Sequence, residues 1–413
     1  MRILIVSQYF WPESFIINDL AREWAHAGHH VEVLTGKPNY PDGKVYAGYT
    51  EEGCSSEEFD HGITVHRVPL RPRKTGRAKD LSLNYLSFVW NGIRHGNKLV
   101  GKGRFDVVLV FAMSPITAAL PAIWLKRRLR SHLAVWIQDL WPESLSATGF
   151  VRNRFLLGMV GVMIRFIYAG ADTLLVQSHA FREPVARYTR RDKISYYPNC
   201  FADTEAMPLV EATVPEDVLA KVESKFSIVF AGNLGMVQAL DTIVAAAEFL
   251  RDVPNCQFVI AGGGSRAVWL ATQVRERKLD NVLLTGRLPV SDMPHIFKRA
   301  GALLVTLKRE EIFAYTVPSK LQAYLAAGRP VIAALDGEGA RVVEEAAAGL
   351  TCPAEDARGL ADRILEMLEM LPQARQAMGE AGRAYFLRNF ELKKQARSLI
   401  DFFEAKIGKQ GSE

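Results

Sequence analysis

The sequence is poor in cysteine, and the positions of the few cysteines exclude two common structural devices. Only four are present in 413 residues: Cys54, Cys200, Cys256 and Cys352. They lie far apart and form neither a CxxC pair nor a Cys/His cluster, which argues against a zinc site and against a disulfide framework. This usage is typical of a reducing compartment. The start, Met1–Ser7, is too short for the apolar region of a signal peptide and continues into domain sequence.

Two nucleotide-binding fingerprints are also missing. The chain has no GxxxxGK[ST] motif and no GxGxxG motif between a strand and a helix, which disfavours an ATPase or a dinucleotide enzyme. No low-complexity tract and no internal repeat of 20–50 residues is visible. The remaining possibilities are those of an ordinary globular protein, with 49% hydrophobic and 23% charged residues.

One uncharged run is long enough on paper to span a bilayer, residues 107–125. It contains Pro115 and Pro121, and its first five residues are typical of a buried parallel strand. We therefore predict a strand at 107–111, a turn at 113–115, and a buried helix that ends in Lys126-Arg127-Arg128.

The length predicts two domains, because 413 residues exceed what one hydrophobic core usually serves. Strand and helix patterns alternate in the first half, lose their period around 199–225, and then alternate again. Such alternation indicates parallel sheets covered by helices on both faces. We predict an α/β protein with two doubly wound, Rossmann-like domains facing each other across a cleft. The expected parts are 1–200, 201–390 and a C-terminal helix at 391–413 that can return to the first domain.

The net charge of +6 hides a strong asymmetry. Residues 61–130 contain 14 Lys or Arg and only two acids, Asp80 and Asp106. This suits nucleic acid or an anionic membrane, but no nucleic-acid-binding motif accompanies it. Residues 151–168 form an apolar helix with basic flanks, and two interpretations stay open: an interfacial helix, or a buried core helix beside a solvated basic face. The membrane interpretation selects Arg127, Arg128, Arg130, Phe155 and Ile164 as contacts.

A second-half stretch has the features of an anion site. A helix is expected to open near Pro318 and Ser319, since proline is tolerated in a first helical turn, and it stops at Gly328 before a strand at 331–335. Free amides at a helix start, with a hydroxyl and Lys320 beside them, suit a phosphate or diphosphate. The alternative is a packed helix whose lysine is merely solvated.

Other small or cationic groups follow the predicted strands of the same half. They are Gly232-Asn233-Leu234-Gly235, Gly262-Gly263-Gly264, Thr285-Gly286-Arg287 and Lys308-Arg309. Ligands of such sheets bind beyond the carboxyl ends of the strands, where glycines admit phosphates close to the backbone. Together these groups indicate a nucleoside-diphosphate site.

The order of these motifs resembles glycosyltransferase family 4, retaining enzymes of the GT-B architecture, and within it the bacterial fucosaminyltransferase-like branch of polysaccharide enzymes. The stretches that carry the resemblance span nearly the whole chain: 8–13 (QYFWPE), 35–41 (TGKPNYP), 138–144 (QDLWPES), 231–238 (AGNLGMVQ) and 318–331 (PSKLQAYLAAGRPV). The resemblance implies a nucleotide sugar held by the second domain, an acceptor met by the first, retention of anomeric configuration, and no bound metal or other cofactor.

The resemblance also implies roles for individual residues. Donor contacts fall on Gly232, Asn233, Gly235, Gln238, Gly262, Gly263, Arg287, Pro318, Ser319 and Lys320, with the ribose near Gln322 and Ala323. Acceptor contacts fall on Glu13, Asn18 and Trp141, and catalytic candidates are Asp139, Glu143 and Lys320. Asp139 follows a predicted strand and could orient or deprotonate the acceptor; its alternative role is to cap the next helix.

The chain departs from the family pattern in two ways. The family has a Glu-x7-Glu pair where this chain has Tyr315 and Ala323, so both carboxylates are missing. Glu310, Glu311 and Glu338 are candidate substitutes. In the first phosphate loop the family has an Arg and a Lys, and this chain has Asn233 and Gln238 at those positions.

We expect an enzyme that moves a sugar from a UDP-sugar to a polyprenyl-diphosphate-linked or other glycan acceptor. The resemblance implies an N-acetylated deoxyhexosamine as the sugar. The expected pathway makes cell-surface polysaccharide such as lipopolysaccharide or exopolysaccharide. Its expected location is cytoplasmic, on the inner face of the membrane. The alternatives are a non-hydrolysing UDP-sugar epimerase, and a nucleotide-sugar-binding protein without turnover.

Overall fold

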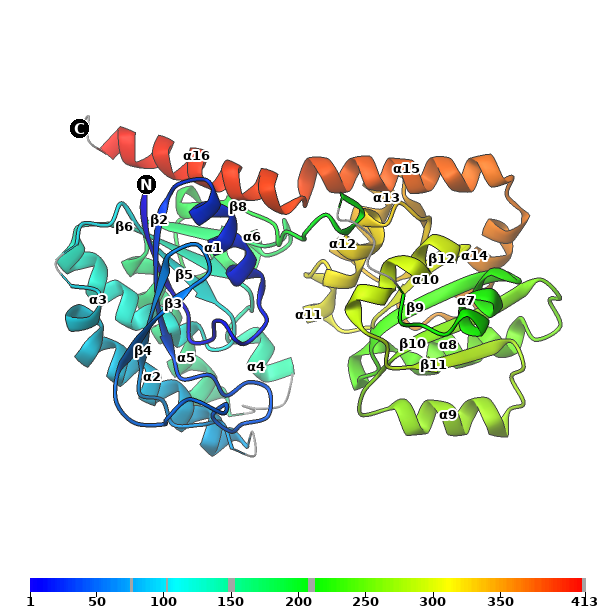
Figure 1. Cartoon of the computed structure of the whole chain (residues 1–413), viewed down its shortest axis with the longest axis horizontal. Helices are drawn as coiled ribbons and strands as arrows, with labels where there is room; N and C mark the ends of the chain where they lie inside the picture. Colours follow the sequence, from blue (N-terminus) through cyan, green and yellow to red (C-terminus); the bar gives the residue numbers. More distant parts are fainter. Residues whose placement is uncertain (75–76, 102, 148–152, 207–211, 411–413) are drawn as a thin grey trace. The chain divides into compact units, whose positions relative to one another are not determined.

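The computed structural model describes residues 1–74, 77–101, 103–147, 153–206 and 212–410. The chain divides into two compact units (Figure 1). Unit 1 comprises Met1–Asn199 and Leu392–Glu413, and unit 2 comprises Cys200–Glu391.

Unit 1 is built on an eight-stranded sheet with the order β3-β4-β2-β1-β5-β6-β7-β8. Only the β3–β4 pair is antiparallel. The central strands β1, β5 and β6 consist almost entirely of buried residues, as expected for a parallel sheet covered on both faces. The strands are β1 Arg2–Val6, β2 His30–Gly36, β3 Ser55–Phe59, β4 Ile63–Val68, β5 Val107–Ala112, β6 His132–Ile137, β7 Thr173–Val176 and β8 Ile194–Tyr196.

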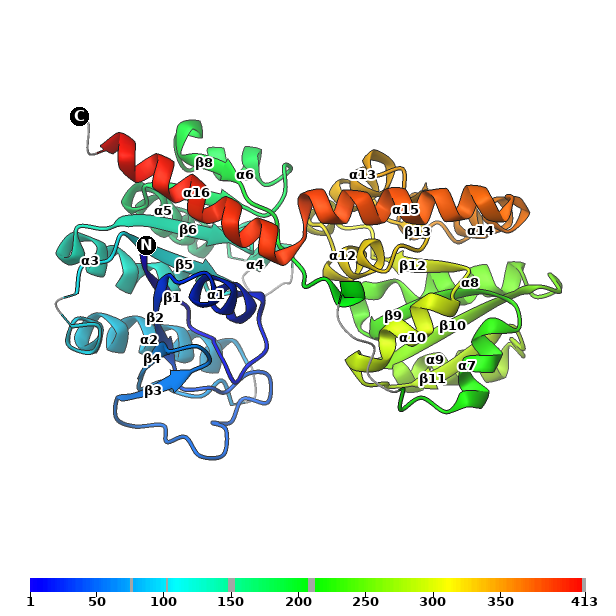
Figure 2. The ribbon, with the colours of Figure 1, turned by 45° about the horizontal axis from the view of Figure 1, so that its top comes forward.

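The longer helices of unit 1 lie on opposite faces of this sheet. Helix α2 packs on α3 and α3 packs on α5, whereas α1 packs on α16 (Figures 1 and 2). Right-handed crossovers explain the division: the connections β4–β5, β5–β6 and β6–β7 run across the sheet in one direction, and β1–β2 runs in the other. The helices are α1 Ile16–His26, α2 Ala78–Leu99, α3 Ala119–Leu129, α4 Glu143–Ala147, α5 Arg154–Gly170, α6 Arg182–Ala186 and α16 Leu392–Gln410, with 3-10 turns η1 Ile116–Ala118 and η2 Arg191–Lys193.

The C-terminal helix α16 is attached to unit 1 by two side chains that reach its backbone. The indole Nε1 of Trp24 on α1 donates to Ala396 O at 2.9 Å. The hydroxyl of Tyr197 donates to Gln395 O at 3.2 Å. Both bonds are buried, so the helix is held by hydrogen bonds as well as by apolar packing.

The long uncharged run forms strand β5 and helix α3, which confirms the strand-plus-helix prediction. Every residue of β5 is buried, and the inner residues of α3 pack over the sheet. Within the described ranges, no helix has the length and apolarity needed to cross a membrane.

Unit 2 is a six-stranded, all-parallel sheet with the order β11-β10-β9-β12-β13-β14. Its strands are β9 Phe226–Asn233, β10 Cys256–Gly263, β11 Val282–Gly286, β12 Ala302–Thr306, β13 Val331–Ala334 and β14 Gly349–Cys352. Its helices are α7 Glu216–Glu223, α8 Leu240–Phe249, α9 Ala267–Glu276, α10 Met293–Arg299, α11 Glu311–Ala314, α12 Ser319–Ala326, α13 Glu338–Glu345, α14 Ala357–Glu369 and α15 Pro372–Asn389, with 3-10 turns η3 Thr204–Ala206, η4 Met236–Gln238 and η5 Val290–Asp292.

The two faces of the unit 2 sheet carry separate cores. Val229 and Ala231 of β9 pack with α12 and α15 residues on one side. Ile228 and Phe230 of the same strand pack with α8 and α14 residues on the other. This alternation is the period of two that a strand requires, and it leaves the strand ends as the place where polar groups collect.

Candidate active site

The carboxyl ends of β9 and β10 lie side by side and approach each other closely. Gly262 pairs with Gly232 in the parallel register, and a Cβ built on Gly262 would come within 1.9 Å of Gly232 O. At Gly264 the backbone has φ +157°, and a Cβ there would meet Asn233 Oδ1 and Leu234 O at 2.6 Å each. Only glycine fits these two positions, so the rim keeps a bare backbone that a ligand can approach.

Helix α12 begins at Ser319, as the sequence predicts, with Pro318 in the N-cap position and no side chain capping its amides. The helix is fixed to the sheet by Tyr324, whose buried hydroxyl accepts from Ala231 N at 2.9 Å and lies 3.3 Å from Ala231 O. The first amides of α12 are therefore held at the end of β9, where a helix start favours an anion.

Lys320 is the central cation of this rim. Its ammonium donates to Gln238 Oε1 at 3.0 Å and lies 3.6 Å from the centre of the Phe230 ring. A Cβ on Gly232 would stand 3.7 Å from Nζ, which places the ammonium beside the bare backbone. Burial lowers the pKa of Lys320 to about 7, since no carboxylate of the described residues forms an ion pair with it. An anion at this point would restore the ordinary pKa.

A cavity of about 750 Å³ opens above the rim, and the described residues that line it all belong to unit 2. Among the described residues that line it, the cations are Lys320 and Arg287, and none is Asp or Glu. Arg287 is exposed and follows β11, with its Cβ and Cδ beside Gly263. One wall is apolar and holds Leu288, Val290, Met293 and Phe297. The cavity thus combines a cationic floor with an apolar wall, an arrangement suited to a phosphate joined to a flat base.

Most of the predicted donor residues meet at this cavity. Gly232, Asn233, Gln238, Gly262, Gly263, Arg287, Ser319 and Lys320 all line it. Gly235 is buried below the rim, and Pro318 lies outside the lining. Gln322, predicted near the ribose, is 2% exposed and also lies outside the lining, whereas Ala323 faces the cavity. The apolar wall was not predicted, because it comes from η5 and α10, whose sequence has no motif of its own.

The three substitute carboxylates have other positions. Glu311 accepts a hydrogen bond from the Tyr315 hydroxyl on α11. Glu338 is largely buried and forms an ion pair with Arg341 at 3.0 Å. Glu310 precedes α11 and does not line the cavity. None of these three carboxylates lines the cavity beside Ala323.

In unit 1, Asp139 lies at the corresponding edge, just after β6. Ser114, in the loop after β5, hydrogen-bonds to this carboxylate, and burial raises the pKa of Asp139. Trp141 is only 7% exposed, and its Nε1 donates to Ser114 Oγ at 3.1 Å. Glu143 opens α4, half-buried, with Arg187 Nη1 at 3.8 Å. Asp139 and Trp141 thus share one serine, which fixes the carboxylate against the strand ends.

Cationic and aromatic groups surround this edge. The Arg73 guanidinium lies 4.9 Å from the centre of the Tyr40 ring and 5.8 Å from that of Tyr9. Burial raises the pKa of Tyr85, and the charges of Arg73 and Asp139 both act on it. Arg73 forms no ion pair with a described residue, so its charge is open to an anionic ligand.

Glu13 and Asn18, predicted to contact an acceptor, are buried and hydrogen-bonded within the loops that carry them. Glu13 is 2% exposed and accepts from the backbone amides of Phe10, Asn39 and Tyr40 at 2.7–3.2 Å. Asn18 is 5% exposed, accepts from Trp11 N and donates to Glu13 O. Burial raises the pKa of Glu13 to about 7, against these three N–H donors. The two residues fix the loop after β1 to the loop after β2.

The predicted membrane residues divide into two groups. Arg127, Arg128 and Arg130 are exposed, and Phe155 is 75% exposed. Ile164 is fully buried against the sheet side of α5. The prediction is wrong for Ile164, because α5 has one face in the core and one outside, and the sequence period alone did not separate them.

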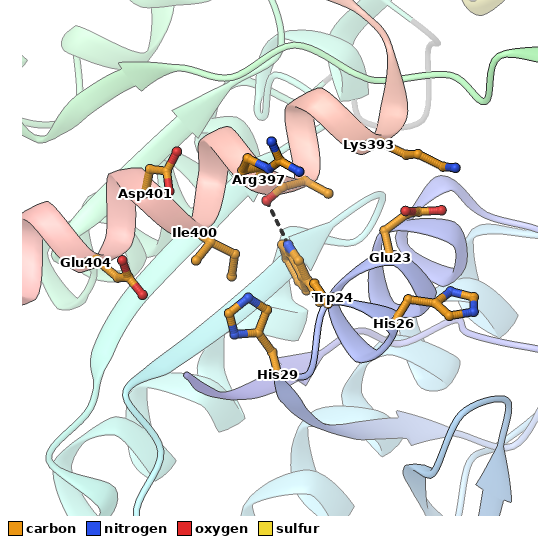
Figure 3. A pocket seen from close by; sticks show the side chains of 11 residues that line it. Glu23, Trp24, His26, His29, Lys393, Arg397, Ile400, Asp401 and Glu404 are labelled. Atoms are coloured by element: carbon orange, nitrogen blue, oxygen red, sulfur yellow. Dashed lines mark hydrogen bonds between the residues drawn. The ribbon is translucent and has the colours of Figure 1, made fainter.

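A second cavity, of about 610 Å³, lies in unit 1 between α1 and α16 (Figure 3). Its wall mixes both signs of charge, including Glu23, Lys393 and Asp401. The Trp24–Ala396 hydrogen bond crosses it. It sits beside the attachment of α16 and lacks the glycine-rich backbone of the unit 2 cavity.

Comparisons with known proteins agree with this division. The family model described as "Glycosyl transferase 4-like domain" matches residues 15–200, and that described as "Glycosyl transferases group 1" matches 215–385. WbjE of Pseudomonas aeruginosa, named a glycosyltransferase, is 24% identical over 278 residues, covering 66% of this chain and 69% of that protein. WcaI of Escherichia coli is 24% identical over 340 residues, covering 79% and 82%.

Solved structures share the fold across both units. Sucrose-phosphate synthase of Thermosynechococcus elongatus superposes with a TM-score of 0.71 at 17% identity and covers 99% of each chain. HepE of Anabaena superposes with a TM-score of 0.69 at 14% identity, covering 98% of this chain and all of the other. With both units matched, the chain is a glycosyltransferase of the family 4 type with the GT-B fold.

Proposed function

We propose that the enzyme transfers a sugar from a UDP-sugar bound in unit 2 to a lipid-linked glycan acceptor received by unit 1, with retention of configuration. The observation that carries the proposal is the Lys320 site: a desolvated cation, a helix start and a bare glycine backbone converge on one point. Such a site stabilises the negative charge that develops on a departing diphosphate. HepE, which shares the fold, has been solved with UDP and with UDP-glucose.

The transfer requires only groups that the two substrates and this chain supply. The bond from the anomeric carbon to the diphosphate oxygen breaks, and a bond to the acceptor hydroxyl oxygen forms. The hydroxyl proton passes to the leaving diphosphate, which Lys320 and Arg287 help to neutralise. Asp139 orients the acceptor hydroxyl. We propose no bound metal, since these two cations already face the diphosphate position.

The substrate classes follow from the relatives and the family branch. WcaI is named for colanic acid biosynthesis, and the fucosaminyltransferase-like motifs favour an N-acetylated deoxyhexosamine donor. We extend to this enzyme a role in cell-surface polysaccharide synthesis at the inner face of the membrane. The cationic edge around Arg73 suits an acceptor that carries a diphosphate near its sugar.

The test is a thermal-shift panel of UDP, GDP and their sugars, followed by product analysis. UDP should raise the melting temperature progressively, with the logarithm of its concentration above the Kd, because it binds only the folded state. Donor and acceptor extract together should yield a lengthened glycan. A new UDP-sugar epimer formed without acceptor, or no response to any nucleotide, would contradict the proposal.

A further inference from the structure

In the described part of unit 1, the exposed large hydrophobic side chains belong to three helices. Among its described residues, nine large hydrophobic side chains are exposed, from 38% for Ile93 to 75% for Phe155, and all belong to α2, α3 or α5. They are Leu86, Trp90 and Ile93 on α2, Trp124 on α3, and Phe155, Leu156, Met159, Val162 and Phe166 on α5. Soluble proteins rarely gather so many on one side without a partner. We call these nine residues the outer helical face.

The nine exposed side chains belong to three helices that lie side by side on one face of the sheet. Gly92 of α2 packs against Pro121 of α3, and Gly170 at the end of α5 packs against Ile123. On α5, the buried Ile164 and Ile167 face the sheet. Met159, Val162 and Phe166 recur at helical spacing on the opposite side, which makes a second apolar stripe directed away from the core.

The charges of the same helices are almost all positive. Together α2, α3 and α5 carry eight Lys or Arg and one acid, Asp80. Helices α1 and α16, on the other sheet face, carry six Lys or Arg and four acids, and none of their described side chains is an exposed large hydrophobic. Apolar side chains with a cationic surround match the interface of an anionic bilayer. A protein partner would not require positive charge on every helix of its docking face.

We propose that the outer helical face rests on an anionic phospholipid bilayer, with Trp90, Trp124 and Phe166 in the interface and the surrounding arginines against the headgroups. Tryptophan favours that depth because its ring is apolar and its N–H stays hydrated. This deepens the proposed function, on which it rests for the lipid-linked acceptor, by assigning the membrane contact to two helices beyond α5.

Helix α2 joins this face to the acceptor edge. Its inner residue Asn84 accepts from Gln8 Nε2 at 2.6 Å and donates to Arg71 O at 2.6 Å, both in loops of that edge. Two residues later, Leu86 is 60% exposed on the outer side. Only helix α2 therefore separates a bilayer at the outer helical face from the loops of the acceptor edge. This arrangement shortens the path of a lipid-linked acceptor.

The experiment is co-sedimentation with vesicles of phosphatidylcholine containing phosphatidylglycerol. The variant carries Trp90→Ser and Phe166→Ser together. Its matched control is Phe249→Ser on α8 of unit 2, because Phe249 is 54% exposed and Phe166 is 56% exposed. The double variant should bind vesicles at least about tenfold more weakly, and the control should bind like the parent. Unchanged melting temperatures verify that both are folded.

Three further readouts decide the outcome. The tryptophan emission of the parent should shift to the blue on vesicles, because Trp90 and Trp124 enter the interface. Equal vesicle binding by the parent and the double variant would overturn the proposal. So would a lipid-free dimer that the double variant loses, because the face would then belong to a second copy. UDP binding should be the same in all variants. If the parent does not bind UDP, the proposed function is refuted. The membrane proposal then still depends only on vesicle binding by the outer helical face.

Discussion

The lowered pKa of Lys320 makes donor binding depend on pH. Because burial holds this pKa at about 7 in the free enzyme, the ammonium is about half protonated at pH 7 and mostly neutral at pH 8.5. A bound diphosphate raises the pKa again, so each binding event takes up a proton wherever the free lysine is neutral. UDP affinity should therefore fall as pH rises above 7, by up to about tenfold per pH unit.

Isothermal titration calorimetry of UDP between pH 7 and 8.5 measures this directly. Over that range the diphosphate of UDP is already ionised, because the pKa of the final proton of such a phosphate is about 6. The expected loss of affinity is about 10–30-fold. Buffers of different ionisation enthalpy should reveal uptake of about half a proton at pH 7 and nearly one at pH 8.5. Lys320→Arg is the control, because arginine stays charged throughout and its binding should not change with pH.

An affinity that stays constant from pH 7 to 8.5 in the parent enzyme would refute this reasoning. The same shift has a consequence for folding. The folded pKa lies below the unfolded value, so the unfolded state binds more protons and the free energy of unfolding rises with pH from about 7 toward 10. The gain without UDP should amount to a few kcal/mol at most, and Lys320→Met should abolish the pH-dependent part.

Four further predictions address other residues. Asp139→Asn should lower turnover by about 100-fold, because the acceptor hydroxyl is no longer oriented, without weakening UDP binding, and unchanged turnover would remove Asp139 from the mechanism. Glu13→Gln should lower the free energy of unfolding by about 1–3 kcal/mol in urea, whereas exposed Glu52→Gln should not; equal stabilities would contradict the loop-fixing role. Ala323→Glu should strengthen binding of UDP over its 2′-deoxy analogue by about tenfold or more, and an unchanged ratio would place the ribose elsewhere. Reversing Arg127, Arg128 and Arg130 to Glu should release the enzyme from anionic vesicles at low salt, and undiminished binding would show that these charges do not face lipid.

The alternation of strand and helix and the opening of α12 were predictable because they depend on local sequence. Pro318 at a helix start and Gly328 after its end are local signals that the structure confirms. The residues around Lys320 could be grouped for the same reason, since parallel strands end on one edge of a sheet.

Strands β3 and β4 and helix α2 were not predicted, and α2 shows why. Its buried stripe is Leu81, Asn84, Phe88, Gly92 and Gly96, in which only two residues are large and apolar. Its hydrophobic residues Leu86 and Trp90 point outward instead. In α2 the large apolar residues thus lie largely on the exposed side and small or polar ones on the buried side. This reversal made the helix hard to predict from the sequence, and it places apolar side chains on the outer helical face.

The roles of Glu13 and Ile164 could not be read from local sequence. The carboxylate of Glu13 is occupied by amides more than 25 residues away, at Asn39 and Tyr40. Ile164 is buried because α5 packs on the sheet, which its apolar composition on both sides does not reveal. Both outcomes depend on packing between distant segments.

The central claim is that a nucleoside diphosphate binds at the strand ends of unit 2. A crystal structure of the enzyme grown with UDP tests it most directly. We expect the diphosphate against the amides of Gly232 and Asn233 and the start of α12, within hydrogen-bonding distance of Lys320 Nζ. UDP bound elsewhere, or a rim that stays empty at saturating UDP, would contradict the assignment.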